Sequence, residues 1–309
     1  MSYLGPGFEP PPSLRRPRAR TVALAALVPT ALLGWLVYEA VASPGGGDTG
    51  ATAAGSPTGV TSSAPAGTPS DDAKESATAT APGAGPLTGK VVLIDPGHNP
   101  DNFKHTAEIN RKVDIGTNMK ECDTTGTSTN AGYAEAEFTL DVARRLRTIL
   151  QQQGATVKFT QDGDRAWGPC IDERARIGNA AHADAALSIH ADGAPDGDRG
   201  YHLILPGSVH AGGADTRPIV ASSADLGKRI GAGFAHVTGS APANYVGDGT
   251  GLVTRTDMGG LNLSTVPKVL IECGNMRDSK DAALVTSASW RQKAAQGMSE
   301  GIVSFLRGS

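Results

Sequence analysis

The sequence is poor in cysteine and has no excess of positive charge. Its 309 residues include three cysteines, too few for a disulfide-rich scaffold or for a zinc site built from four thiolates. The formal net charge is -3, so the composition gives no indication of a polyanionic partner, and we expect no nucleic-acid binding. Seven histidines remain as candidate metal ligands.

Charge is nearly absent from residues 21–42, in which Glu39 is the single charged side chain. As a helix of about 22 residues this segment would be about 33 Å long, enough to cross a hydrocarbon core of about 30 Å. Four arginines stand just before it, and a positive flank stays on the cytoplasmic side of a membrane (Arg15, Arg16, Arg18 and Arg20). We therefore expect a cytoplasmic tail over 1–20 and a transmembrane anchor over 21–42.

A cleaved signal peptide is the alternative, because Ala40-Val41-Ala42 fits an A-x-A cleavage site. The length of the apolar stretch favours the uncleaved anchor. Under either interpretation the rest of the chain is exported. It is then membrane-anchored in the cell envelope, or secreted if the segment is removed.

Aromatic residues are absent from residues 43–86, which consist almost entirely of Ala, Gly, Ser, Thr and Pro. Such a segment buries too little apolar surface to offset the entropy of ordering, so we expect a disordered linker. As a flexible coil it would average about 36 Å from end to end. The composition changes near Lys90, and residues 87–309 are expected to form one folded domain that is monomeric.

Short apolar runs alternate with helical periodicity in residues 87–309. The pattern predicts strands over 91–95, 155–160, 185–189, 202–205 and 269–272, and helices over 135–153, 172–183, about 221–237 and about 289–306. This alternation is typical of an α/β domain with a mostly parallel sheet flanked by helices on both faces.

Polar residues stand where three of the predicted strands end. His98 follows VVLIDPG, His190 closes AALSI, and Glu272 closes KVLI. Ligands bind at the carboxyl ends of the strands in sheets of this kind. We therefore expect these three side chains to converge on one edge of the sheet.

The helix predicted from residue 135 offers two carboxylates, Glu135 and Glu137, which lie about 200° apart around its axis. Glu135 shares a stripe with the apolar residues of the helix (Phe138, Val142, Leu146 and Ile149). It is therefore expected to point toward the sheet. The alternative is an acidic residue that is favoured at this position only by the helix dipole.

His98, Glu135 and His190 together form a set of two imidazoles and one carboxylate, which suits a catalytic zinc ion with a fourth position open for water. The pKa of a water bound in that position falls to about 7. A separate carboxylate must then take the proton of the water, and Glu272 on an apolar strand suits that role.

Four segments of the chain resemble the signature blocks of the zinc-dependent N-acetylmuramoyl-L-alanine amidases. They are KVVLIDPGH, the helix of Glu135 with its continuation LDVA, ADAALSIHADGAP, and VPKVLIECGN, and they occur in the family's order. The resemblance implies cleavage of peptidoglycan at the amide between N-acetylmuramic acid and L-alanine of the stem peptide. It also implies that His98, Glu135 and His190 are the zinc ligands and that Glu272 is the catalytic glutamate.

The chain departs from the family pattern in two places. The glutamate is followed by Cys273-Gly274-Asn275 instead of x-G-F, and residues 99–134 are longer and more polar than the usual glycine-rich turn. We expect residues 99–134 to form a loop or hairpin near the site. Cys122 in this segment is expected to pair with Cys170, whereas Cys273 on an apolar strand is expected to be a buried thiol.

Several other polar residues have less specific signals. Arg255, Asp257 and Asn262 are candidates for contacts with the stem peptide, with ordinary loop capping as the alternative. Asp192 is a candidate for orienting a ligand. The five remaining histidines are expected to be solvated or structural (His105, His182, His202, His210 and His236).

Two competing functions remain open at the level of the sequence. One is a wall-binding module that has the fold without turnover, although such modules usually lose a ligand or the glutamate. The other is a different metal hydrolase, such as a peptidase or an N-deacetylase acting on wall sugars.

Overall fold

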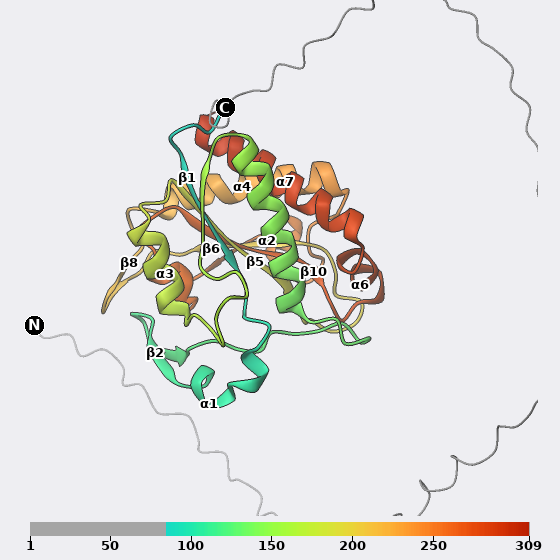
Figure 1. Ribbon diagram of the computed structural model, residues 1–309, viewed down its shortest axis with the longest axis horizontal. Helices are drawn as coiled ribbons and strands as arrows, with labels where there is room; N and C mark the ends of the chain where they lie inside the picture. The colour runs from blue at the N-terminus through green and yellow to red at the C-terminus, as the bar shows by residue number, and fades with distance from the viewer. Residues whose placement is uncertain (1–84, 309) are drawn as a thin grey trace, which may run out of the picture. The chain divides into compact units, whose positions relative to one another are not determined.

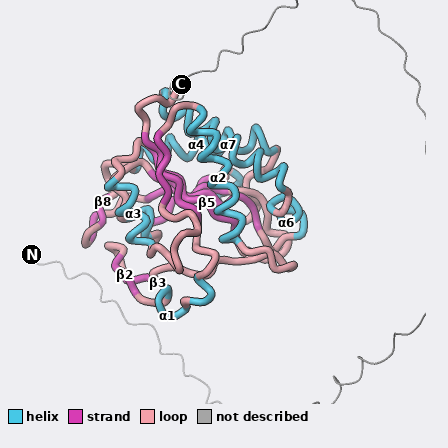
Figure 2. Tube along the Cα trace, in the orientation of Figure 1, coloured by secondary structure: helices cyan, strands magenta, loops and turns pink. Residues whose placement is uncertain are grey.

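The computed structural model describes residues 85–308, which form an α/β domain around a six-stranded sheet (Figures 1 and 2). The expected tail (1–20), membrane segment (21–42) and nearly all of the expected linker (43–86) lie outside the described residues. No helix within 85–308 is long and apolar enough to cross a membrane.

The sheet has a parallel part and a part that runs the opposite way. Its strand order is β4 (Thr156–Phe159), β1 (Val91–Pro96), β5 (Ala185–Asp192), β10 (Lys268–Asn275), β6 (His202–Pro206) and β9 (Leu252–Arg255). The first four strands are parallel, whereas β6 is antiparallel to β10 and β9 is parallel to β6. The loop between β5 and β6 is short, so the chain re-enters the sheet at the edge where β5 ends and runs in the opposite direction. A parallel β6 would need a longer crossover connection.

Helices cover both faces of the sheet, as the alternating pattern predicted. One face packs against α2 (Glu135–Gln152), α4 (Val220–Thr238) and α7 (Ala288–Arg307), and the ribbon shows α4 and α7 side by side (Figure 1). Phe138, Phe234 and Trp290 form an aromatic cluster between these helices. The other face packs against α3 (Ile171–Ala180) and α5 (Gly259–Asn262) over two smaller apolar clusters.

Most predicted elements are present, with shifts at their ends. The helix predicted over 172–183 ends at Ala180, because His182 adopts a left-handed turn with φ of 47° before β5. The short strand β9 lacks an alternating pattern and was not predicted. The remaining short elements are η1 (Asn102–Lys104), α1 (Thr106–Ile109), β2 (Lys112–Asp114), β3 (Met119–Glu121), β7 (His210–Ala211), β8 (Ala214–Asp215), η2 (Gly247–Gly249) and α6 (Ser279–Val285).

Residues 99–134 form the short elements η1 and α1 and the β2–β3 hairpin, at the end of the domain toward which β1 runs (Figure 1). A disulfide joins Cys122 at the end of this segment to Cys170 just before α3, the pair expected from the sequence. It closes a loop with a sequence separation of 48 residues, which corresponds to about 4 kcal/mol in the chain-entropy model. Cys273 is a free, buried cysteine, as expected.

The register of the sheet places three polar side chains in one row. Glu272 on β10 pairs with His190 on β5 at one side and with His202 on β6 at the other. Directly paired residues point to the same face of a sheet, so these three side chains share a face at the carboxyl edge of β5 and β10.

Candidate metal centre and active site

His98, Glu135 and His190 come together at the carboxyl edge of the parallel strands. Each offers one ligand atom, and these atoms lie within 4.8 Å of one another. The Nε2 atom of His98 is 3.2 Å from Oε1 of Glu135, and Nδ1 of His190 is 2.9 Å from the same oxygen. The two imidazole rings meet edge to face with their centroids 4.9 Å apart.

His98 follows β1 in a left-handed backbone conformation, with φ of 60°. This region is costly for a residue other than glycine and persists only where the surroundings hold it. The carbonyl of His98 accepts hydrogen bonds from Gln161 (3.0 Å) and Arg174 (2.9 Å). These two side chains therefore hold the backbone turn that aims the imidazole at Glu135.

Glu135 is the first residue of α2 and is 4% exposed, whereas Glu137 is exposed. Its carboxylate accepts hydrogen bonds from the backbone N–H groups of Thr127 (2.9 Å) and Ala191 (3.2 Å). The helical phase therefore identified the carboxylate that faces the two histidines.

Two glycines make room for this cluster. A Cβ atom on Gly97 would lie 2.3 Å from the ring of His190, and one on Gly126 would lie 2.8 Å from both Glu135 and His98. Larger residues at these positions would displace the three candidate ligands. The glycine of the DPGH segment thus has a packing role next to the site.

The donor set fits a divalent cation such as zinc, both chemically and electrostatically. Imidazole nitrogens and a carboxylate are common zinc donors. Burial alone would raise the pKa of Glu135, but His98 and His190 lower it well below its ordinary range. Burial likewise disfavours the charged form of His98, yet Glu135 and Asp123 raise its pKa well above the usual value. Positive charge beside Glu135 therefore stabilises its buried carboxylate, and a metal ion would supply that charge in place of a proton.

Glu272 is the next side chain in the row beside His190. Its Oε2 atom is buried and has no hydrogen-bond partner in the structure. Burial raises the pKa of Glu272 well above its usual value, and the negative charges of Glu135 and Asp192 raise it further. A cation held by the neighbouring cluster would oppose this effect and favour the carboxylate form that a general base needs.

Asp192 and His202 lie near Glu272, and both contact Tyr245. Asp192 accepts a hydrogen bond from the Tyr245 hydroxyl (2.7 Å) and one from the Gly193 N–H (2.6 Å). His202 is buried, with its ring edge to face against Tyr245. Burial lowers the pKa of His202, which favours the neutral imidazole.

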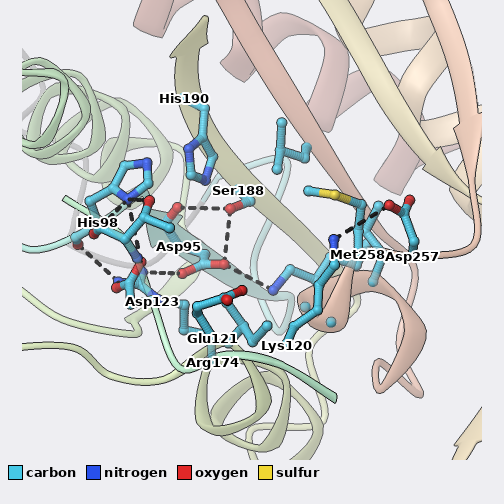
Figure 3. A pocket seen from close by; sticks show the side chains of 17 residues that line it. Asp95, His98, Lys120, Glu121, Asp123, Arg174, Ser188, His190, Asp257 and Met258 are labelled. Carbon is cyan, nitrogen blue, oxygen red and sulfur yellow. Dashed lines mark hydrogen bonds and ion pairs between the residues drawn. The ribbon is translucent and has the colours of Figure 1, made fainter. Parts of the chain in front are cut away.

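A cavity of about 240 Å³ extends from the two histidines along the α3–α5 face of the sheet. Figure 3 shows His98 and His190 on one side of the cavity and Met258 and Asp257 on the other. Lys120 from the β2–β3 hairpin lies 3.4 Å from Asp257, so an ion pair links the hairpin to the opposite wall.

Buried charges line part of this cavity. Asp95 on β1 accepts hydrogen bonds from Lys268 (2.9 Å), Arg174 (2.8 Å) and the hydroxyl groups of Thr160 and Ser188. All three charged side chains are at most 5% exposed. We did not predict this network. The available signal was the presence of charged residues within an apolar strand and within the apolar stripe of a helix, because such residues are seldom buried without a partner.

We expect the substitution Asp95→Asn to lower the free energy of unfolding by about 3–5 kcal/mol, because Lys268 would stay buried without its counter-charge and Arg174 would keep only Asp123 as a charged partner. Burial raises the pKa of Asp95, but Lys268 and Arg174 more than offset that and lower it far below the ordinary value. The stabilisation is therefore present above about pH 4 and lost as the pH falls further.

Urea unfolding of wild type and variant between pH 7 and pH 3 measures this effect. Asp162→Asn is the control, since Asp162 pairs with Arg144 and Arg147 at the surface and should contribute less than about 1 kcal/mol. Equal unfolding free energies for wild type and Asp95→Asn at neutral pH would contradict the proposed role of the buried network.

The three predicted substrate contacts lie in different environments. Arg255 and Asp257 form an ion pair of 2.6 Å in which both side chains reach solvent, and Asp257 lines the cavity. Asn262 is 0% exposed, which favours the loop-capping alternative over a contact with the stem peptide. Its amide donates to the carbonyls of Thr256 (2.8 Å) and Ile115 (3.3 Å), which is the loop-capping alternative.

Asn262 therefore anchors the β2–β3 hairpin, which contains Ile115 in its turn, to the body of the domain. We expect Asn262→Ala to lower the free energy of unfolding by about 1–3 kcal/mol, because the buried carbonyl of Ile115 and the partly buried carbonyl of Thr256 lose a donor. Denaturant unfolding is the measurement, and Asn130→Ala is the control because Asn130 is exposed. A variant as stable as the control would show that the anchor contributes little.

The other histidines lie apart from the candidate metal centre. His105 contacts Glu108, His210 contacts Asp215, and His236 contacts Glu300, each at 3.5 Å near solvent. His182 occupies the turn between α3 and β5. These positions agree with the solvated or structural roles expected from the sequence.

Known proteins resemble this chain over its folded domain. The family model described as N-acetylmuramoyl-L-alanine amidase matches residues 92–304. An N-acetylmuramoyl-L-alanine amidase of Mycobacterium tuberculosis is 40% identical over 221 residues, which cover 71% of this chain and 88% of that protein.

Two solved structures extend this similarity to the fold. The crystal structure of the N-acetylmuramyl-L-alanine amidase Ami1 from Mycobacterium smegmatis has a TM-score of 0.66 and 37% identity, and it covers 73% of this chain and 100% of that one. The apo form of Ami1 from Mycobacterium abscessus has a TM-score of 0.63 and 40% identity, and it covers 71% and 99%. The sequence and structural matches cover a similar share of the chain.

Proposed function

This chain belongs to the N-acetylmuramoyl-L-alanine amidase family, and we propose that it hydrolyses peptidoglycan with a zinc ion held by His98, Glu135 and His190. The activity of the family is cleavage of the amide between N-acetylmuramic acid and the L-alanine of the stem peptide. The observation that carries the zinc proposal is the convergence of these three side chains next to Glu272.

A zinc ion bound there supplies positive charge that polarises the scissile carbonyl and lowers the pKa of water. The residues of the chain must then orient the substrate and move one proton. Two observations support Glu272 for this transfer: it neighbours His190 in the row of side chains, and one of its oxygens has no partner. We assign it as the general base.

In the proposed reaction Glu272 takes a proton from the attacking water while the new C–O bond forms at the lactyl carbonyl. It then delivers that proton to the amide nitrogen as the C–N bond breaks. The products are a carboxylic acid on the sugar and a free amine on L-alanine, so atoms and protons balance. Arg255 and Asp257 remain candidates for contacts with the stem peptide, since both reach solvent near the cavity.

Metal analysis together with product analysis tests this proposal. The purified full chain is expected to hold about one zinc ion per molecule, lose activity on muropeptides after chelation and regain it with added zinc. Mass spectrometry of the products distinguishes release of intact stem peptides from peptidase or deacetylase products. Turnover that survives complete metal removal would contradict the zinc proposal, and binding of peptidoglycan without new products would favour a binding module.

We also propose that residues 21–42 hold the enzyme at the membrane, so that the domain acts in the cell envelope. The apolar length of this segment and the arginines before it support that placement. Membrane fractionation with alkaline carbonate washing tests it, and release of the intact chain into the soluble fraction would contradict the anchor.

A further inference from the structure

We infer that Asp123, which lies in the segment between β3 and α2, is a positioning residue for the metal site. Asp123 fixes which ring nitrogen of His98 faces the metal, and the Cys122–Cys170 disulfide braces it. This inference rests on the proposed zinc function and adds to it a residue outside the three ligands.

The surroundings of His98 determine which nitrogen carries the hydrogen. Its Nε2 atom faces Glu135, at 3.2 Å. Its Nδ1 atom lies 3.1 Å from the carbonyl oxygen of Thr124, 3.2 Å from the Thr124 hydroxyl and 3.3 Å from Oδ1 of Asp123. The carbonyl and the carboxylate only accept hydrogen bonds, and the hydroxyl can accept one, so a hydrogen on Nδ1 satisfies all three neighbours. With the hydrogen on Nδ1, the lone pair of Nε2 points toward the Glu135 side, where a metal ion would replace a proton.

Asp123 is itself held rigidly. It is 5% exposed, and its carboxylate accepts a hydrogen bond from Nη2 of Arg174 (3.0 Å) and one from the Thr124 N–H (2.8 Å). Asp123 thus presents a fixed acceptor oxygen beside Nδ1 of His98.

The disulfide joins the two chain segments that carry Asp123 and Arg174. Cys122 directly precedes Asp123, and Cys170 precedes α3, which carries Arg174 on its first turn. The N–H of Ile171 also donates to the carbonyl of Cys122 (2.7 Å), so both chain segments are joined at this point. The bridge thus holds Asp123 and Arg174 at the distance that the contact with His98 requires.

The affinity of the full chain for zinc tests the inference, measured by competition with a chromophoric chelator. Replacing an outer partner of a metal-binding histidine typically weakens metal affinity by about 10–100-fold, and we expect that loss for Asp123→Asn. A smaller loss is expected for the double variant Cys122→Ser with Cys170→Ser, in which Asp123 remains but its brace is removed.

Asp281→Asn is the matched control. Asp281 is also a buried carboxylate that accepts from an arginine (Arg199, 2.9 Å) and from backbone N–H groups, but it contacts none of the three ligands. Its zinc affinity should equal that of wild type. If wild type binds no zinc, the proposed function fails; if wild type and Asp123→Asn bind zinc equally well, the inference about Asp123 is wrong.

A second measurement needs no variant and so does not depend on whether Asp123→Asn folds. In the zinc-loaded wild type labelled with ¹⁵N-histidine, long-range ¹H–¹⁵N correlations report the state of each ring nitrogen. We expect a protonated Nδ1 and a metal-bound Nε2 for His98. A His98 that binds the metal through Nδ1 would overturn the inference.

Discussion

Glu272→Gln should reduce the turnover of muropeptides by at least about 100-fold, and by up to about 10,000-fold, while the bound zinc is retained. The substitution preserves the shape of the side chain and removes its ability to accept a proton. Glu272 lies beside His190 in the sheet but is not one of the three clustered ligand residues. The proton transfer should therefore fail while the metal site stays intact.

Steady-state kinetics and metal analysis on the same preparation measure both parts of this expectation. Glu137→Gln is the matched control, since Glu137 is an exposed carboxylate close to the site in sequence but directed away from it. Its activity should be close to that of wild type. Full activity of Glu272→Gln with zinc bound would show that another group serves as the base.

His190→Ala should have a different signature, with zinc content and activity falling together. This variant removes one of the three candidate ligands, and it leaves the buried Glu135 carboxylate with one imidazole partner fewer. Two remaining side chains should hold the ion far more weakly than three. We therefore expect substoichiometric zinc after dialysis and turnover reduced in proportion to the metal lost.

The comparison with another histidine makes this prediction specific. His210→Ala removes an exposed imidazole that lies away from the site beside Asp215 and Arg217, and it should leave zinc content and activity unchanged. Retention of stoichiometric zinc by His190→Ala would exclude His190 from the ligand set, even if activity were lost.

The sequence predicted the parts of the site that depend on strand ends and helical phase. Apolar runs located β1, β5 and β10, and the residues that close these runs lie at one edge because parallel strands end together. The stripe of apolar residues along α2 distinguished Glu135 from Glu137. Both signals are local in the sequence, so they can be recognised without knowledge of the tertiary contacts.

The residues that were missed act through contacts between distant segments. Asp123 and Arg174 are separated by 51 positions, and Lys268 and Asp95 by 173, so no local pattern joins them. Substrate contact and loop capping could not be distinguished for Asn262 from the sequence, because only the packing of the hairpin buries its amide. The antiparallel direction of β6 was not predicted either, because it depends on pairing with β10, which lies far away in the sequence.

Anomalous diffraction at the zinc edge, from crystals grown with zinc, tests the central claim most directly. We expect one strong peak within bonding distance of His98, Glu135 and His190, on the side from which Glu272 can reach a neighbouring water molecule. A zinc peak held by other residues, or no peak among these three side chains in catalytically active protein, would contradict the proposed metal site.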